Sequence, residues 1–113
     1  MPVSYYILLV FAPVLIVVGI LGFLIPPQKA LTSGEPAYNI FHIVFGVAGL
    51  LIVLSGSESA VRGFNLVFGV IDLYQAGASY FDWFPAKLFR WTRIDDILHV
   101  LIGLILVVAA LVG

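Results

Sequence analysis

The chain has 113 residues, of which 63% are hydrophobic and only 10% are charged, and its formal net charge is -1. A soluble domain of this size does not need so apolar a composition, and the charge gives no electrostatic footprint for a nucleic acid. The absence of cysteine excludes disulfides, iron–sulfur centres, thiolate metal sites and covalent haem attachment.

Four apolar segments approach the length of about 20 residues that a helix needs to cross a hydrocarbon core. They cover residues 5–26, 38–55, 61–81 and 94–112. These long runs lack the alternation of strands, and four hairpin strands could not close a barrel. The sequence therefore predicts an all-α fold, a four-helix transmembrane bundle that forms a single domain over residues 1–113.

The first segment is almost wholly apolar, and Pro13 inside it is expected to kink the helix. The residues before it lack the positive region of a signal peptide, so we expect this helix to be retained. Pro26 and Pro27 are expected to end the helix, and Pro36 suits the first turn of the next one.

The second and fourth helices repeat one pattern around the only two histidines of the sequence. A polar residue stands three positions before each histidine and a glycine four positions after it, so the three share a helical face. The two patterns are Asn39-x-x-His42-x-x-x-Gly46 and Asp96-x-x-His99-x-x-x-Gly103. A proline-marked loop precedes each of these helices, so the sequence predicts two parallel helix-pair repeats with both histidines at one depth.

The third segment is the least apolar and gathers polar and small residues on one face. An ionised aspartate in mid-membrane costs roughly 2.5–3.5 kcal/mol on insertion scales, so such a residue usually faces the interior with a partner. We expect Asp72 to face inward and to pair with Gln75, His42 or His99. The predicted polar cluster beside the histidines comprises Asn39, Asp72, Gln75 and Asp96.

The loop before the fourth helix is aromatic and basic, a composition typical of the membrane–water interface. We expect a short surface helix within it, and a helix cap formed by Thr92 and Asp95. The residues predicted to contact lipid headgroups or the interface are Trp83, Lys87, Arg90, Trp91 and Arg93. The two longer loops together carry Lys29, Lys87, Arg90 and Arg93, whereas the short loop on the other side carries only Arg62. The positive-inside rule therefore puts the two longer loops in the cytoplasm.

These motifs resemble a family of small four-helix bacterial membrane proteins that is catalogued as a domain of unknown function. The resemblance covers residues 37–107 best. It rests on the two histidine patterns together with Arg62-x-Phe64 and Phe68-Gly69-Val70 in the third helix. It implies the topology, the repeat and a multi-pass protein of a bacterial inner membrane, cytoplasmic or photosynthetic. The family has no established activity, so the resemblance implies no mechanism.

Several interpretations of the histidine pattern remain open. The imidazoles can fix helix packing through polar contacts, which contribute about 0.6 kcal/mol each in membranes. They can ligate a tetrapyrrole of the haem b or chlorophyll type, since haem iron takes one or two histidines. They can relay protons or ions with Asp72 in an oligomer. A carboxylate–histidine metal site is the weakest interpretation, because only Asp72 and Asp96 could supply carboxylates.

No phosphate loop, nucleophile elbow or metalloprotease motif occurs in the sequence. We therefore expect a non-enzymatic integral membrane protein, an accessory or scaffolding subunit of a larger membrane complex. Its partners would be the lipid bilayer and other membrane subunits, without nucleic acid or metal. Tetrapyrrole binding by His42 and His99 is the first alternative, and transport through Asp72 and the histidines is the second.

Overall fold

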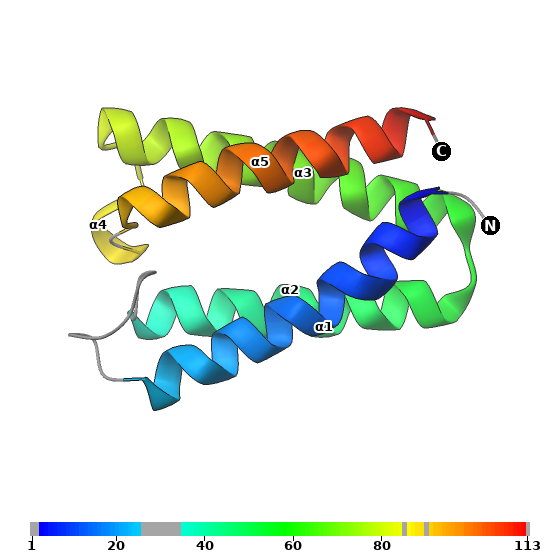
Figure 1. Cartoon of the computed structure of the whole chain (residues 1–113), viewed down its shortest axis with the longest axis horizontal. Coiled ribbons are helices and arrows are strands. Elements are labelled where there is room, and N and C mark those ends of the chain that lie inside the picture. Colours follow the sequence, from blue (N-terminus) through cyan, green and yellow to red (C-terminus); the bar gives the residue numbers. More distant parts are fainter. Residues whose placement is uncertain (1–2, 26–34, 85, 90, 113) are drawn as a thin grey trace.

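The structure, a computed structural model, describes residues 3–25, 35–84, 86–89 and 91–112, except for the side chains at 87 and 88. This part of the chain contains four long helices, one short helix and no strand (Figure 1), which confirms the predicted all-α four-helix bundle. The helices are α1 (Val3–Leu24), α2 (Pro36–Ser55), α3 (Glu58–Phe81), α4 (Ala86–Phe89) and α5 (Arg93–Val112).

The helices begin one to three residues earlier than the apolar pattern predicts, and their first residues explain why. Pro36 opens α2 because a proline at the first helical position loses no hydrogen bond. Ser57 caps α3 by accepting a hydrogen bond of 3.2 Å from the backbone N–H of Ala60. The short α4 lies where the sequence predicts a surface helix. The predicted end of the first helix at Pro26 and Pro27 lies outside the described residues.

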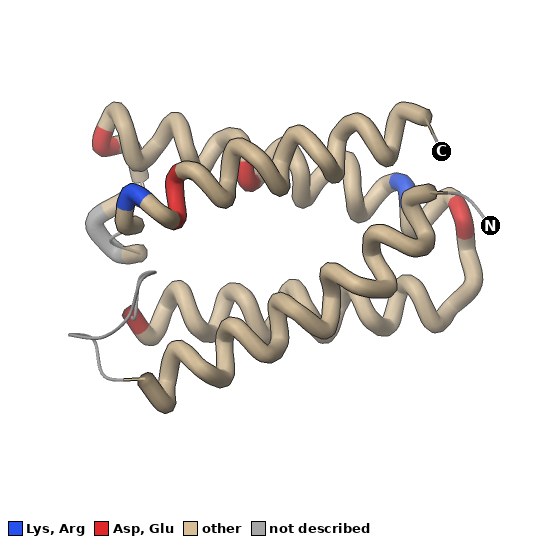
Figure 2. Tube along the Cα trace, viewed as in Figure 1, with Lys and Arg blue, Asp and Glu red and all other residues tan. Residues whose placement is uncertain are grey.

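Three helices, α1, α2 and α5, are long and apolar enough to cross a membrane by length and composition. The fourth long helix, α3, has 24 residues but a lower mean hydropathy, because it carries Glu58, Arg62 and Asp72. Figure 2 shows how few charges lie along the bundle and that most of them lie near its two ends. The middle of the bundle therefore has the polarity of a membrane interior.

The long helices form two antiparallel pairs, α1 with α2 and α3 with α5, as Figure 1 shows. Glycines allow the backbones within each pair to approach closely. A Cβ atom on Gly46 would lie 2.9 Å from the Ala12 carbonyl oxygen, and one on Gly103 would lie 2.9 Å from the Gly69 carbonyl oxygen. Small residues commonly permit such approach between membrane helices. Each pair is antiparallel within itself, but the equivalent helices of the two pairs run in the same direction, so the predicted parallel helix-pair repeat is confirmed.

The two pairs are related by a constant offset in residue number, the one that leads from His42 to His99, which we call the repeat offset. It carries Ala12 to Gly69 and Gly46 to Gly103, so the same glycine-on-carbonyl contact occurs in both pairs. Residues related by this offset also meet each other, as equivalent positions do beside a twofold axis. The rings of Phe11 and Phe68, for example, pack edge-on with centroids 5.8 Å apart.

The first turns of α1 join the two pairs at the end of the bundle opposite α4 (Figure 1). The Ser4 hydroxyl donates a hydrogen bond of 2.8 Å to the Ala109 carbonyl of α5. The Asn65 side-chain amide of α3 donates one of 3.0 Å to the Ser4 carbonyl. Behind these bonds, the buried apolar side chains Leu15, Phe68 and Leu106 form a core between the pairs.

Candidate functional site

Tyr38 and Asp95 join the two helix pairs at the end of the bundle where α4 lies. The Tyr38 hydroxyl donates a hydrogen bond of 2.6 Å to Oδ1 of Asp95. Both side chains are buried, at 3% and 1% exposed. A hydrogen bond to a charged group contributes about 1.5–3 kcal/mol, and the same carboxylate left unpaired in the interior would be costly. The bond therefore ties the start of α2 to the start of α5.

The other oxygen of the Asp95 carboxylate caps α5, as the sequence predicts. Oδ2 accepts a bond of 2.9 Å from the Thr92 backbone N–H, while the Thr92 hydroxyl accepts one of 3.2 Å from the Asp95 backbone N–H. This reciprocal arrangement satisfies two donors that the helix start would otherwise leave without partners. Asp95 thus connects the cap of α5 to the tyrosine of α2.

His42 lies one turn beyond Tyr38, and its Nδ1 is 2.8 Å from the Tyr38 carbonyl oxygen. A carbonyl oxygen can only accept, so Nδ1 carries a proton and donates this bond. In the neutral imidazole, Nε2 is then the nitrogen with the lone pair. The imidazole also packs against the Tyr38 ring, with centroids 4.2 Å apart. His42 is thus held by its own helix.

His99 has the equivalent position in α5 and is 5% exposed, but it is not held in the same way. Its buried Nδ1 has no hydrogen-bond partner among the described residues. The Trp91 ring packs edge-on against the imidazole, with centroids 5.7 Å apart. Asp95 lies within electrostatic range of both His42 and His99. The two histidines occupy equivalent positions in the repeat and are both buried, but they differ in their hydrogen bonds.

A row of aromatic rings connects the two histidines across the α4 end of the bundle. Phe41 lies beside His42, Phe89 of α4 lies beside Phe41, and Trp91 lies beside both Phe89 and His99. The successive ring centroids are 5.4–5.9 Å apart, within the range of favourable aromatic contacts. Phe89 is 8% exposed, so α4 covers this end with a buried ring.

The residues predicted for the membrane interface take different positions. Trp83 is half-exposed and stacks on Phe81, with centroids 4.9 Å apart. Trp91 instead packs inward against Phe89 and His99, and its buried Nε1 has no partner within the described part of the chain. Arg93 is exposed at the start of α5. The Lys87 side chain and the whole of Arg90 lie outside the described residues.

The residues of the predicted polar cluster do not meet as one group. Asp72 and Gln75 are buried on α3, each 4% exposed, and in the described structure neither hydrogen-bonds to a histidine or to the other. Asn39 packs against the Gly22 position of α1. Asp96 is half-buried, and its Oδ1 has no partner among the described residues. The expected pairing of Asp72 with Gln75 or a histidine is therefore wrong for the described residues.

The pair that joins the two repeats, Tyr38 and Asp95, lies outside the predicted polar cluster. The histidine pattern directs attention to the positions three residues before each histidine, which are Asn39 and Asp96. The bonded pair stands four residues before each histidine instead. Aligning the two halves with the repeat offset places Tyr38 opposite Asp95, a donor opposite an acceptor. That alignment is the signal in the sequence that would have found the pair.

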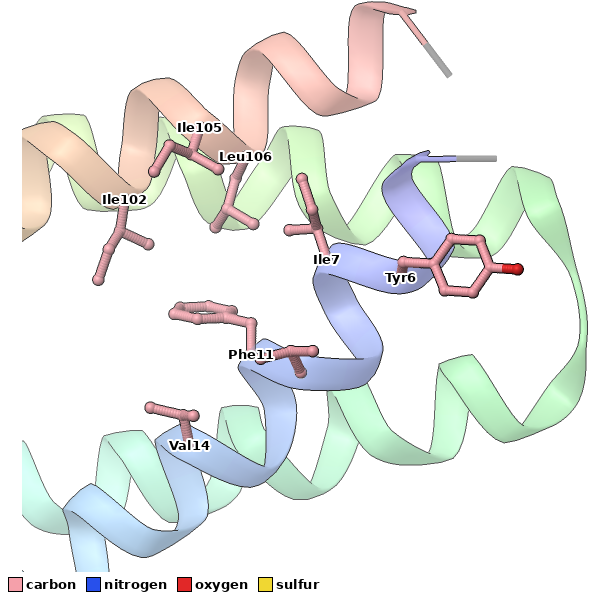
Figure 3. Close-up of a pocket in the computed structure, with 8 residues that line it drawn as sticks. Tyr6, Ile7, Phe11, Val14, Ile102, Ile105 and Leu106 are labelled. Atoms are coloured by element: carbon pink, nitrogen blue, oxygen red, sulfur yellow. The ribbon is translucent and has the colours of Figure 1, made fainter. Parts of the chain in front are cut away.

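An open apolar groove of about 400 Å³ runs between α1 and α5 (Figure 3). Ile7 and Phe11 line it from α1, and Ile102 and Leu106 line it from α5. The repeat offset relates Ile7 to Phe64, and at that equivalent place the ring packs onto Phe68 with centroids 5.6 Å apart. Phe64 thus packs against a neighbouring ring at the place where the equivalent Ile7 lines an open groove.

The described residues contain no group of three or more His, Cys, Asp or Glu side chains placed to hold a metal ion. In comparisons with known proteins, no family model, no curated protein and no solved structure matches this chain.

Proposed function

We propose that this protein is a non-enzymatic, multi-pass protein of a bacterial inner membrane that serves as an accessory or scaffolding subunit of a larger membrane complex. In this proposal it belongs with the small four-helix family that its motifs resemble. The observation that carries the proposal is the bonding of Tyr38 to Asp95 and of His42 to the Tyr38 carbonyl. These polar groups of the repeat are engaged with one another, which is the arrangement of a structural joint.

All four long helices cross the membrane in this proposal, including α3. At 1.5 Å per residue its 24 residues extend about 36 Å, more than the hydrocarbon core of about 30 Å. Its charged residues Glu58 and Arg62 stand within its first two turns, and Asp72 is 4% exposed inside the bundle. Charged side chains inside membrane helices almost always face the bundle interior. The lower hydropathy of α3 is therefore compatible with a span.

The outer surface supports a role in association. Large apolar side chains are exposed on every long helix, and the groove between α1 and α5 adds an apolar hollow. In water such patches mark interaction sites, and in a membrane they face lipid or another subunit. The bundle is 12.3 kDa, so it has little interior of its own in which to build a reaction site.

The experiment is extraction of the tagged chain from its native membrane with a gentle detergent, followed by separation by native size. We expect the chain to migrate with other membrane subunits in one discrete assembly, at constant ratio across two detergents. Migration only as a monomer or as copies of itself would contradict the proposal. Topology is tested with Ser57→Cys, which we expect to react with an impermeant thiol reagent added outside intact cells.

Tetrapyrrole binding is the second candidate, and the position of the proton on Nδ1 of the neutral His42 ring favours it. Metal-ligating histidines commonly donate one ring N–H to a carbonyl, which orients the other nitrogen toward the metal. Nδ1 of His42 makes such a bond, and Nε2 keeps its lone pair. His42 would hold the group, and His99 would be its partner at the same depth. A Soret or chlorophyll band that copurifies with the protein and disappears in His42→Ala would establish this function; its absence would exclude it.

A further inference from the structure

A second hollow, of about 390 Å³, lies on the α3–α5 pair at the end of the bundle opposite α4, and its lining is partly polar and partly apolar. Glu58, Ser59 and Arg62 provide its polar side, and Leu66 and Leu111 its apolar side. Gly63 also lines the hollow, and the space beside it is open, since a Cβ atom there would have no neighbour within 4 Å. Neither the histidine pattern nor the joint between the repeats involves these residues.

The two charged groups of this hollow do not neutralise each other. Glu58 and Arg62 are four residues apart on α3, the spacing at which a helical ion pair usually forms. In the described structure they form no ion pair. Arg62 instead donates a hydrogen bond of 2.9 Å from Nε to the Ala110 carbonyl near the end of α5. That bond orients the guanidinium, and its two Nη nitrogens are left to bind another acceptor.

The order of the groups along α3 matches the order of groups in a phospholipid. At 1.5 Å per residue, Glu58 stands about 6 Å closer to the helix start than Arg62, and Leu66 about 6 Å further along. In a membrane-spanning α3 this sequence runs from the surface inward as anion, cation and hydrocarbon. A phosphatidylethanolamine molecule presents the complementary order, with its ammonium outermost, then its phosphate, then its acyl chains.

We propose that this hollow binds phosphatidylethanolamine, with Arg62 on the phosphate, Glu58 on the ammonium, and Leu66 and Leu111 beside the start of an acyl chain. The inference rests on the proposed insertion of α3 in the membrane. The charges argue for a zwitterionic headgroup, because an anionic lipid would satisfy Arg62 and leave Glu58 beside negative charge. They argue against phosphatidylcholine, whose quaternary ammonium has no N–H to donate to the carboxylate.

The test is native mass spectrometry of the full chain, titrated with equimolar phosphatidylethanolamine, phosphatidylglycerol and phosphatidylcholine of matched acyl chains. We expect the wild-type chain to carry about two to five times more ethanolamine lipid than either competitor, the range that an exposed charge pair supplies. Equal adducts of all three lipids would overturn the proposal, and Arg62 would then be only a cap for α5. A preference for phosphatidylglycerol would overturn it as well.

Three variants separate the two charges from general effects on the fold. Arg62→Gln should lower the adducts of every phospholipid, and Glu58→Gln should lower only the ethanolamine adduct. Asp82→Asn is the matched control for Glu58→Gln, since it removes an exposed carboxylate at the opposite end of α3. An equal loss of ethanolamine adduct in Asp82→Asn and Glu58→Gln would contradict the assignment. Membrane extraction of each variant is scored separately, so that failure of insertion, which would refute the proposed function, is distinguished from failure of lipid binding.

Discussion

Tyr38 and Asp95 occupy the same position in the two repeats, four residues before a histidine, and they hydrogen-bond to each other at 2.6 Å. In a repeat protein, equivalent residues meet where the symmetry axis passes between the repeats. The bond therefore marks this axis at the α4 end, as the Phe11–Phe68 contact marks it in the interior. Because Tyr38 and Asp95 are different residues, one supplies a donor and the other an acceptor.

Close backbone approach predicts that Gly46→Ala and Gly103→Ala each destabilise the bundle. In both, the new methyl group would lie 2.9 Å from a carbonyl oxygen of the partner helix, so the helices must move apart. Overpacking of this kind typically costs about 1–3 kcal/mol. Thermal unfolding in detergent measures the change. Gly63→Ala is the control, because open space at that position predicts no loss and a small gain in helix stability.

The burial of Asp72, without a hydrogen bond to another described residue, predicts that Asp72→Leu raises stability. Asp72 is 4% exposed, and the equivalent residue of the first repeat is Leu15. Replacing a buried polar group that lacks a partner by an apolar one removes its desolvation cost. Asp72→Asn keeps a polar group there and should gain less. A fall in melting temperature for Asp72→Leu, with Asp72→Asn unchanged, would contradict this prediction and show that the carboxyl has a stabilising partner.

The groove between α1 and α5 predicts that larger side chains can be placed there at no cost to stability. The repeat offset relates Ile7 to Phe64 and Ile102 to Phe45, so Ile7→Phe with Ile102→Phe gives the groove the two rings of the other repeat. Filling an apolar hollow restores dispersion contacts that its lining otherwise lacks. We expect the double variant to melt at the same temperature as the wild type or higher.

Val17→Phe with Val108→Phe is the matched control for the groove. Both valines are more than half exposed on α1 and α5, and neither lines the groove. The control should leave the melting temperature unchanged, since its rings would meet only detergent. A clear loss of stability in the groove variant alone would mean that the two halves are not equivalent at this place.

Much of the fold follows from the sequence because the hydrophobic spacing and each copy of the histidine pattern involve only residues that are close together in the chain. Apolar runs gave the four long helices, and the pattern around His42 and His99 gave two parallel pairs with both imidazoles buried. The cap of Thr92 and Asp95 was predictable because it depends on residues three apart.

The composition of the site was less predictable because it depends on which helix faces meet. Tyr38 stands at a helix start, where an aromatic residue is typical of the interface, and nothing local indicates that its hydroxyl reaches α5. Trp91 was expected at the interface for the same reason, but packing around Phe89 turns it toward His99. The sequence predicts Asp72 beside the histidines, but the described structure gives it no hydrogen bond to either of them.

If the residues around the histidines join the two repeats, the hydrogen bond between Tyr38 and Asp95 must couple them energetically, and a double-mutant cycle on this pair measures the coupling. The variants are Tyr38→Phe, Asp95→Ala and the pair, with free energies of unfolding measured in one detergent. Loss of the Thr92 cap occurs in both variants that lack Asp95, so it cancels from the coupling. We predict a favourable coupling of about 1.5–3 kcal/mol, the contribution of a hydrogen bond to a charged group. A coupling near zero would contradict the joint.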